Sequence, residues 1–160
     1  MTNQDFVYTT YIKSTPEKVW AAITNPEFTR QYWGMDNISD WKKGSDWKHT
    51  DIAGKNVRII GKVLESNPPK RLVLTWADPA DTADDSCVTF EIDAVENMVR
   101  LNVIHSNFKP GSIMATKVVI GWPLVLSNLK TLLETGKAID IMGLKAALKQ
   151  SCGSPEGAAA

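Results

Sequence analysis

The segment from Ile38 to Phe108 constrains the fold more than any other part of the chain. It contains six short runs rich in β-branched and aromatic residues, and turn-forming residues separate each run from the next. Strands joined by short turns pair antiparallel, because a parallel crossover needs about a dozen residues or more. We therefore predict a six-stranded antiparallel meander over the runs ISDW, SDWKHTD, NVRIIGKVLES, RLVLTWA, SCVTFEIDAV and MVRLNVIHSNF.

A strand and two short helices precede this meander. Residues 6–14, FVYTTYIKS, alternate in the manner of a strand and supply a seventh member of the sheet. Thr15 can cap a helix that begins at Pro16, where the missing N–H group costs nothing. The pair Asn25–Pro26 repeats this arrangement and starts a second helix, which we expect to end near Trp33.

Strand parity divides the predicted sheet into two faces, because side chains two positions apart point the same way. One face is nearly all apolar on four successive strands, so it needs a cover from another element. Its members are Val57, Ile59, Gly61, Val63, Leu72, Leu74, Trp76, Val88, Phe90, Ile92, Val99, Leu101, Val103 and His105.

The cover comes from an amphipathic segment in the last third of the chain, which contains Pro123. Apolar residues recur at helical spacing from Ala115 to Leu133, on both sides of the proline. We expect one long helix bent at Gly121–Pro123, because the apolar residues before the proline lie on the same helical face as those after it. A helix that started at the proline would leave this shared face unexplained. The alternative is a loop or strand up to Ile120 and a new helix with Pro123 in its first turn.

Residues 138–160 extend beyond a domain that we place at residues 1–137. We expect a helix over Ala138–Gln150 that docks on this domain or on a second subunit and helps a homodimer form, followed by a flexible tail after Gly153. The apolar positions that support the helix are Ile141, Leu144, Ala147 and Leu148, whereas Lys145 and Lys149 fall off that face.

Charge and hydropathy limit the classes of partner. Eighteen basic and 18 acidic side chains cancel, so no global field favours nucleic acid or an anionic membrane. No apolar run approaches the length of a membrane span. The start MTNQDFVYTT lacks the features of a secretory signal, and Cys87 and Cys152 have no disulfide or zinc spacing. We therefore expect a cytoplasmic protein.

No motif assigns a catalytic residue, a cofactor or a metal site. His49 and Asp51 are not joined by further histidines or cysteines. The acidic run DPADTADD has neither the spacing nor the glycine of an EF-hand, and we interpret it as a solvated hairpin tip. No serine lies in a nucleophile elbow, and no glycine-rich loop has phosphate-binding spacing.

Six residues are candidates for lining a ligand cavity between the sheet and the long helix. The alternative is that they only fill the core, as buried aromatic side chains usually do. The histidine among them falls on the apolar face, so it is either a core residue bonded to a carbonyl or a tyrosine, or a ligand-binding or proton-transfer group. Tyr32 or Thr75 could help to orient a ligand. The six candidates are Trp33, Trp76, Phe90, His105, Trp122 and Leu126.

Four stretches together resemble the family named for activators of the heat-shock protein 90 ATPase, within the START-like (SRPBCC) superfamily. They are TPEKVWAAITNPEFTRQYWG, GKVLESNPPKRLVLTW, VRLNVIHSNF and GWPLVLSNLKTLLETG, in that order, and the resemblance covers residues 6–136. It implies an α+β helix-grip fold. In this fold a seven-stranded antiparallel sheet wraps around a long C-terminal helix, and two short helices follow the first strand.

The resemblance and the residues together lead to three hypotheses of function. The first is a binding protein that holds a small hydrophobic or amphipathic ligand between sheet and helix. The second is a regulator of a chaperone ATPase. The third is an enzyme of the cyclase or dehydratase type, which would need a polar cluster around His105.

Overall fold

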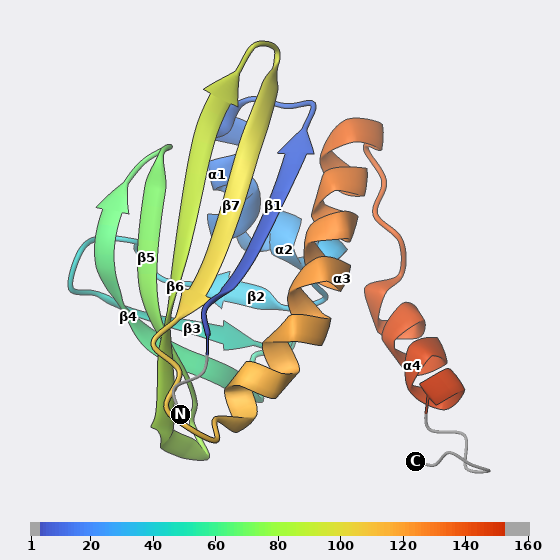
Figure 1. Ribbon diagram of the computed structural model, residues 1–160. Coiled ribbons are helices and arrows are strands. Elements are labelled where there is room, and N and C mark those ends of the chain that lie inside the picture. The colour runs from blue at the N-terminus through green and yellow to red at the C-terminus, as the bar shows by residue number, and fades with distance from the viewer. Residues whose placement is uncertain (1–3, 153–160) are drawn as a thin grey trace.

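Seven antiparallel strands form one curled sheet, and a long helix lies across its concave side (Figure 1). The structure is a computed structural model and describes residues 4–152. The strand order is β1-β7-β6-β5-β4-β3-β2, so β1 joins the end of the meander. The elements are β1 (Phe6–Ile12), α1 (Pro16–Thr24), α2 (Pro26–Tyr32), β2 (Asp36–Ile38), β3 (Asp46–Thr50), β4 (Val57–Asn67), β5 (Arg71–Asp78), β6 (Asp81–Val95), β7 (Met98–Ser106), α3 (Ile113–Thr135) and α4 (Ile141–Cys152).

Both short helices begin where the sequence predicts. The Thr15 hydroxyl accepts a bond from the backbone N–H of Lys18 at 3.3 Å, and α1 follows from Pro16. The Asn25 side chain accepts from the N–H of Glu27 at 2.9 Å at the start of α2. Each cap satisfies a backbone donor that the first helical turn leaves unpaired.

The long helix α3 continues through Pro123, as predicted, and it curves around the sheet (Figure 1). Proline has no N–H group for the carbonyl one turn earlier, which allows a helix to bend. Ser112 caps the helix by accepting from the N–H of Ala115 at 3.1 Å, and Gly136 ends it in the left-handed conformation with φ 85°. The predicted alternative, a new helix from Pro123, is wrong.

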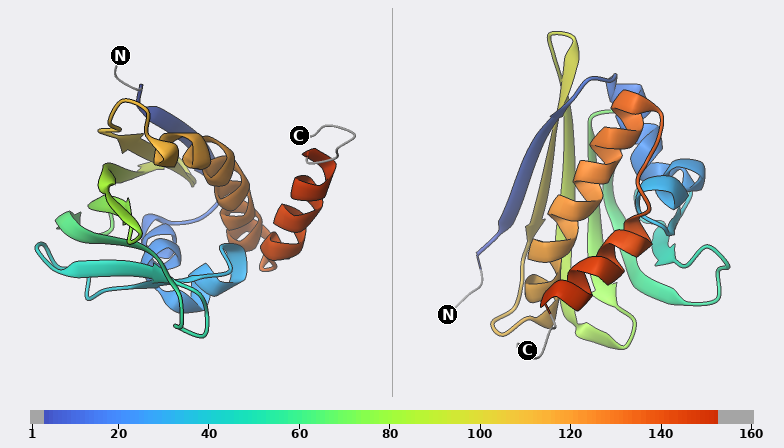
Figure 2. Two further views of the ribbon diagram at one scale, coloured as in Figure 1. Left: turned by 90° about the horizontal axis from the view of Figure 1, so that it is seen from below. Right: turned by 90° about the vertical axis from the view of Figure 1, so that its right-hand side faces the viewer.

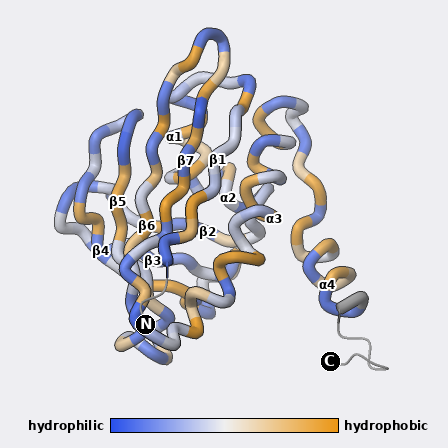
Figure 3. The backbone as a smooth tube through the Cα atoms, in the orientation of Figure 1, coloured by the Kyte–Doolittle hydropathy of each residue, from blue (hydrophilic) through white to orange (hydrophobic). Residues whose placement is uncertain are grey.

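The buried face of the sheet is the one that parity predicts. Leu72, Val88, Val99, Leu101 and Val103 are fully buried on β5, β6 and β7. Figure 3 shows hydrophobic and hydrophilic residues alternating along these strands. The prediction is weaker on β4, where Val63 is buried but Val57 stays exposed near the start of the strand.

Two expected strand boundaries are wrong. The first run, ISDW, is not a strand, because β2 covers Asp36–Ile38 and the chain turns at Trp41 with φ 59°. The acidic run does contain the exposed tip of the β5–β6 hairpin, at Pro79–Ala80, but β6 already begins at Asp81 and one of its acids is not solvated. Asp84 is buried, and its carboxylate accepts from the Ser112 hydroxyl at 2.6 Å and the Met114 N–H at 2.9 Å. A carboxylate at the start of α3 is favoured by the helix dipole.

The C-terminal helix α4 begins three residues later than expected, at Ile141 instead of Ala138. Asp140 precedes it, and its carboxylate accepts from the N–H of Gly143 at 3.1 Å. Figure 2 shows α4 standing beside α3, on the side away from the sheet. Ile141 is buried, whereas Leu148 is 44% exposed, so the predicted apolar stripe is covered at its first turn and exposed at Leu148. The expected flexible tail after Gly153 lies outside the described residues.

None of the helices within residues 4–152 is both long and apolar enough to cross a membrane.

Candidate functional site

Five of the six predicted site residues form one aromatic cluster between the sheet and α3, with Trp122 at its centre. The ring centroid of Trp122 lies 5.5 Å from Trp33, 5.4 Å from Trp76 and 5.9 Å from Phe90. His105 lies 6.3 Å from Trp122. These aromatic side chains come from the C-cap of α2 and from β5, β6, β7 and α3, and all are buried. The sixth predicted residue, Leu126, is buried one turn further along α3.

The hydrogen bonds of His105 define its protonation state. The indole Nε1–H of Trp122 donates to Nδ1 of His105 at 3.1 Å, and an indole nitrogen can only donate. Nε2 therefore carries the proton and donates to the Ser86 hydroxyl at 2.7 Å, which in turn donates to the Trp76 carbonyl at 3.2 Å. Burial lowers the pKa of His105 to about 3, so the ring is neutral at physiological pH.

The sequence leaves two alternatives for His105, a core residue or a group that binds a ligand or transfers a proton. The residue is a core histidine, but it bonds a tryptophan and a serine instead of a carbonyl or a tyrosine. Both partners come from other elements, Ser86 on β6 and Trp122 on α3.

A pocket of about 280 Å³ opens beside the cluster, and we call it the aromatic pocket. It lies between β4, β5, α3 and α4. Three predicted residues line it, namely Trp33, Trp76 and Trp122, whereas Phe90, His105 and Leu126 lie outside its lining. The complete lining is Trp33, Arg58, Ile59, Trp76, Asp78, Met114, Lys117, Val118, Gly121, Trp122, Val125 and Lys145.

The charged members of this lining were not found by sequence reasoning. Arg58 was hidden among the polar positions of an alternating strand. Lys145 was assigned to the side of its helix away from the domain, but it is half-buried and lines the pocket. The spacing within a helix gives its apolar face; it does not give the neighbour beside which the helix docks.

Trp76 has an unusual hydrogen-bonding status. It is 6% exposed, and its buried Nε1–H has no hydrogen-bond partner within residues 4–152. Most buried polar groups in proteins have such a partner. Trp76 lines the aromatic pocket and also a second pocket, whose other lining residues are all different.

This second pocket, which we call the outer pocket, has a volume of about 680 Å³ and includes Trp47, Lys62 and Thr75 in its lining. Trp47 passes over Gly61 and donates from Nε1 to the Thr75 carbonyl at 2.8 Å, while the Thr75 hydroxyl accepts from the Lys62 N–H at 2.7 Å. These two bonds replace part of the regular pairing between β4 and β5. Thr75 is thus placed in the outer pocket and not in the aromatic pocket.

Tyr32, the other residue expected to orient a ligand, has a structural role. It is 1% exposed, and its hydroxyl donates to the Ala22 carbonyl at 2.8 Å. Burial raises the pKa of this phenol. The hydrogen bond from Tyr32 to Ala22 links α2 to α1, so the Tyr32 hydroxyl is not free to bind a ligand in the aromatic pocket.

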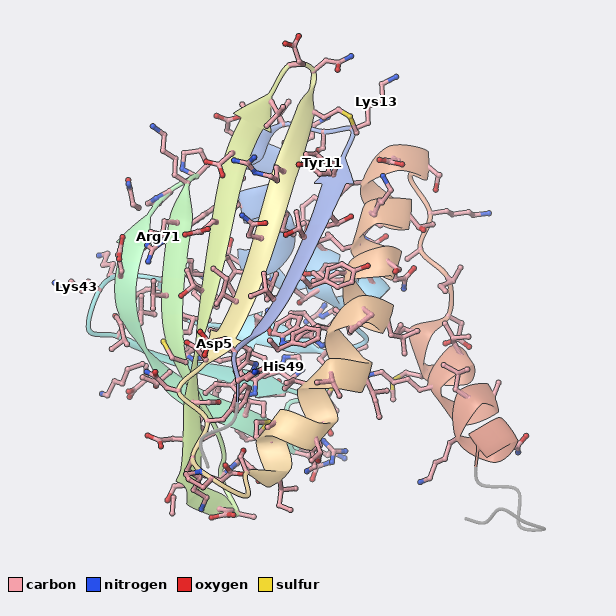
Figure 4. All side chains as sticks on the ribbon, viewed as in Figure 1. Asp5, Tyr11, Lys13, Lys43, His49 and Arg71 are labelled. Carbon is pink, nitrogen blue, oxygen red and sulfur yellow. The ribbon has the colours of Figure 1, made fainter. Side chains whose placement is uncertain are left out.

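His49 is likewise a core histidine. Its Nδ1 bonds the Asn37 side-chain oxygen at 2.6 Å, and the Asn37 amide donates to the Ile23 carbonyl at 3.0 Å. Figure 4 shows His49 in the interior, whereas Lys13 and Lys43 extend away from the body. Burial, followed by the charge of Lys145, lowers the pKa of His49 to about 4. No cluster of three or more metal-ligating side chains occurs among the described residues.

Comparison with known proteins supports the fold and assigns the family. A family model described as "Activator of Hsp90 ATPase homolog 1-like protein" matches residues 13–134. The chain belongs to this family. A comparison with curated proteins gives no match.

Solved structures of other proteins share the fold of this family member. A protein from Mesorhizobium loti is 29% identical with a TM-score of 0.69, and the match covers 81% of this chain and 96% of that one. An HSP90 activator from Plasmodium falciparum is 25% identical with a TM-score of 0.68, over 82% and 96%. The Aha1 dimer from Colwellia psychrerythraea is 24% identical with a TM-score of 0.71, over 85% and 100%. The helix-grip fold predicted from the sequence is therefore confirmed.

One lining residue of the aromatic pocket lies outside the part of the chain that matches the Hsp90-activator family. The match ends at residue 134, and α4 begins at Ile141. Every other lining residue falls within the match, so Lys145 is the contribution of the C-terminal extension.

Proposed function

We propose that this chain binds a small hydrophobic or amphipathic molecule in the aromatic pocket. The observation that carries the proposal is that Trp33, Trp76 and Trp122 line one open pocket between the sheet and α3. Its volume of about 280 Å³ lies at the lower end of small-molecule sites, which span about 300–1,000 Å³. This size favours a ligand with two or three rings or a short chain.

The state of His105 supports binding over catalysis. A general base near neutral pH needs an accessible nitrogen and a pKa near the working pH. His105 is fully buried, both of its nitrogens are bonded, and its pKa is lowered to about 3. A cyclase or dehydratase that used His105 as its base would need a different arrangement, so we do not propose one.

Two measurements test the proposal. Protein purified without detergent is examined by native mass spectrometry for a retained small molecule, and the neutral dye N-phenylnaphthylamine is titrated while its fluorescence is followed. We expect saturable dye binding that a retained ligand, once extracted, displaces. Absence of a retained molecule together with absence of dye binding would contradict the proposal.

A second candidate function is regulation of a chaperone ATPase. It is favoured by the description of the family to which the chain belongs and by the similarity to an HSP90 activator from Plasmodium falciparum. The test is the ATPase rate of Hsp90 with and without this chain, with heat-denatured chain as the control. An unchanged rate, and no co-purification with the chaperone, would remove this candidate.

We further propose that the chain forms a homodimer through the outer sides of α3 and α4. Ile120 on α3 is 71% exposed and Met142 on α4 is 55% exposed, and exposed apolar patches are typical of interfaces. The Aha1 protein from Colwellia psychrerythraea, which shares the fold, is a dimer. Sedimentation of wild type and of Ile120→Lys tests the interface: a monomer in both cases contradicts it.

We also propose that the chain acts in the cytoplasm. Cell fractionation tests this location.

A further inference from the structure

We propose that the ligand of the aromatic pocket is an organic anion, with an apolar body against the tryptophans and a carboxylate or similar acidic head group held by Lys145 and Arg58. This inference rests on the proposed function and names the chemical class of its ligand. It assigns the C-terminal helix α4 a role in ligand selection.

The charged rim of the pocket carries an excess of positive charge. Three cations line it, Arg58, Lys117 and Lys145, and one acid, Asp78. Lys117 lies 4.0 Å from Asp78 and is its ion-pair partner. Within residues 4–152, neither Arg58 nor Lys145 forms an ion pair or a side-chain hydrogen bond, so two positive charges at the rim are unbalanced.

Asp36, whose charge also acts on His49, does not neutralise them because it is already paired. Asp36 is buried near His49 and is held by two bonds from the Arg30 guanidinium, at 2.7 and 3.0 Å. Lys145 and Arg58 both line the pocket, and the charges of both act on His49 and lower its pKa. In the proposed complex, one acidic head group interacts with both.

Lys145 is already partly desolvated. Its side chain is half-buried, and burial lowers the pKa of its ammonium group. A partly buried charge without a partner is unfavourable, whereas a charge-assisted hydrogen bond to an anion stabilises it. An acidic head group would supply the missing partner.

The floor of the pocket suits the other end of such a molecule. Trp33, Trp76 and Trp122 offer aromatic surface, which binds rings and alkyl chains through apolar burial. The unpartnered Nε1–H of Trp76 also favours a ligand that carries an acceptor over a pure hydrocarbon.

The position of Lys145 is built into the structure by the anchoring of α4. Asn128 of α3 is buried, donates to the Tyr32 carbonyl at 3.0 Å and bonds both the N–H and the carbonyl of Ile139, at 2.8 and 3.0 Å. Ile141 is buried and packs close to Gly34. These contacts fix the first turn of α4, and Lys145 is one turn further along.

Two dyes that share a framework test the inference. Anilinonaphthalene sulfonate is anionic, and N-phenylnaphthylamine lacks the acidic group. Both are titrated into wild type, Lys145→Gln and the matched control Lys149→Gln, which changes an exposed lysine on the same helix. We expect wild type to prefer the anion, and Lys145→Gln to weaken the anion about tenfold, as loss of one charge-assisted bond does, without changing the neutral dye. Lys149→Gln should change neither.

The outcomes separate this inference from the proposed function. If both dyes bind wild type equally, or if Lys145→Gln leaves the anion unaffected, the head-group assignment is overturned while the pocket remains a binding site. If Lys145→Gln weakens both dyes equally, Lys145 is only part of the wall, and the assignment is again overturned. If neither dye binds wild type, the proposed function itself fails. Arg58→Gln provides a second variant on a different element, with the same expected loss of the anion.

Discussion

Trp122 and His105 are joined by a hydrogen bond of 3.1 Å that ties α3 to β7 beside the aromatic pocket. Because the indole only donates, the bond requires an unprotonated Nδ1 on His105. Protonation of this ring would therefore break a contact between the long helix and the sheet. The acid–base state of one buried histidine is thus coupled to the packing of the whole fold.

The first prediction is that stability decreases between pH 7 and pH 5. His105 and His49 have folded-state pKa values of about 3 and about 4, both below the value of 6.5 for an unperturbed histidine. Each neutral ring's contribution to the free energy of unfolding is complete above the unfolded-state pKa of 6.5. It is lost as the pH falls below that value, because the histidine is protonated in the unfolded chain before it is protonated in the folded protein. At pH 5 the loss is about 2 kcal/mol for each histidine.

Urea denaturation at pH 7 and pH 5 measures this loss, and His105→Gln is the informative variant. It should be less stable than wild type at pH 7, but its stability should depend on pH about half as strongly. A wild-type protein equally stable at both pH values would show that the two rings are not held neutral.

The second prediction concerns two glycines that differ in their surroundings. A Cβ atom at Gly61 would collide with the Thr75 carbonyl oxygen and with Nε1 of Trp47, whereas a Cβ atom at Gly121 meets nothing within 4 Å. Gly61→Ala should destabilise by about 3 kcal/mol or more, since it breaks a buried bond and overpacks the site. Gly121→Ala should stabilise by about 0.5–1 kcal/mol through helix propensity.

Thermal unfolding of both variants distinguishes a specific requirement for glycine from a general effect of the substitution. If Gly61→Ala unfolds at the wild-type temperature, then the passage of Trp47 over Gly61 toward Thr75 does not contribute to the stability of the sheet.

Local patterns were enough to predict the elements and the faces of this fold. The capping residues Thr15 and Asn25, each followed by a proline, predict where α1 and α2 begin. The alternation of apolar and polar residues along β5 to β7 predicts the buried face. The stripe of α3 could be followed through Pro123, because burial against the sheet outweighs the loss of one backbone bond.

Contacts between distant segments were not predictable in the same way. Asp84 was interpreted as part of a solvated tip because nothing nearby in the sequence shows that it meets the start of α3, 28 residues later. Lys145 was placed on the wrong side because its helix is positioned by Asn128, whose role appears only when α2 and α3 are side by side. The aromatic candidates were brought together, but the charged rim of the pocket was missed.

The third prediction tests this positioning role of Asn128. Asn128→Leu keeps the branched shape of the side chain but removes all three bonds, and it leaves the Tyr32 and Ile139 carbonyls without this donor. We expect a loss of about 2–4 kcal/mol and an α4 that proteases cleave faster. Ser127→Ala changes the exposed neighbour and should behave as wild type. An Asn128→Leu variant with intact α4 would show that Ile141 alone holds the helix.

The fourth prediction separates the two roles of Trp122, as a wall of the pocket and as a hydrogen-bond donor. Trp122→Phe keeps an aromatic ring but removes the Nε1–H, so Nδ1 of His105 becomes a buried acceptor without a donor. We expect a loss of about 1–3 kcal/mol and a His105 that no longer occupies a single tautomer, as read from its ring nitrogen signals in NMR spectra. Trp33→Phe is the matched control, since Trp33 lines the same pocket and contacts the ring of His49 without a hydrogen bond to it. Trp33→Phe should lower the free energy of unfolding by less than Trp122→Phe does, and it should leave the His105 signals unchanged. Both variants should still bind the neutral dye. Equal losses in the two variants, with His105 unaffected in both, would mean that the bond between Trp122 and His105 adds nothing to the packing of their rings.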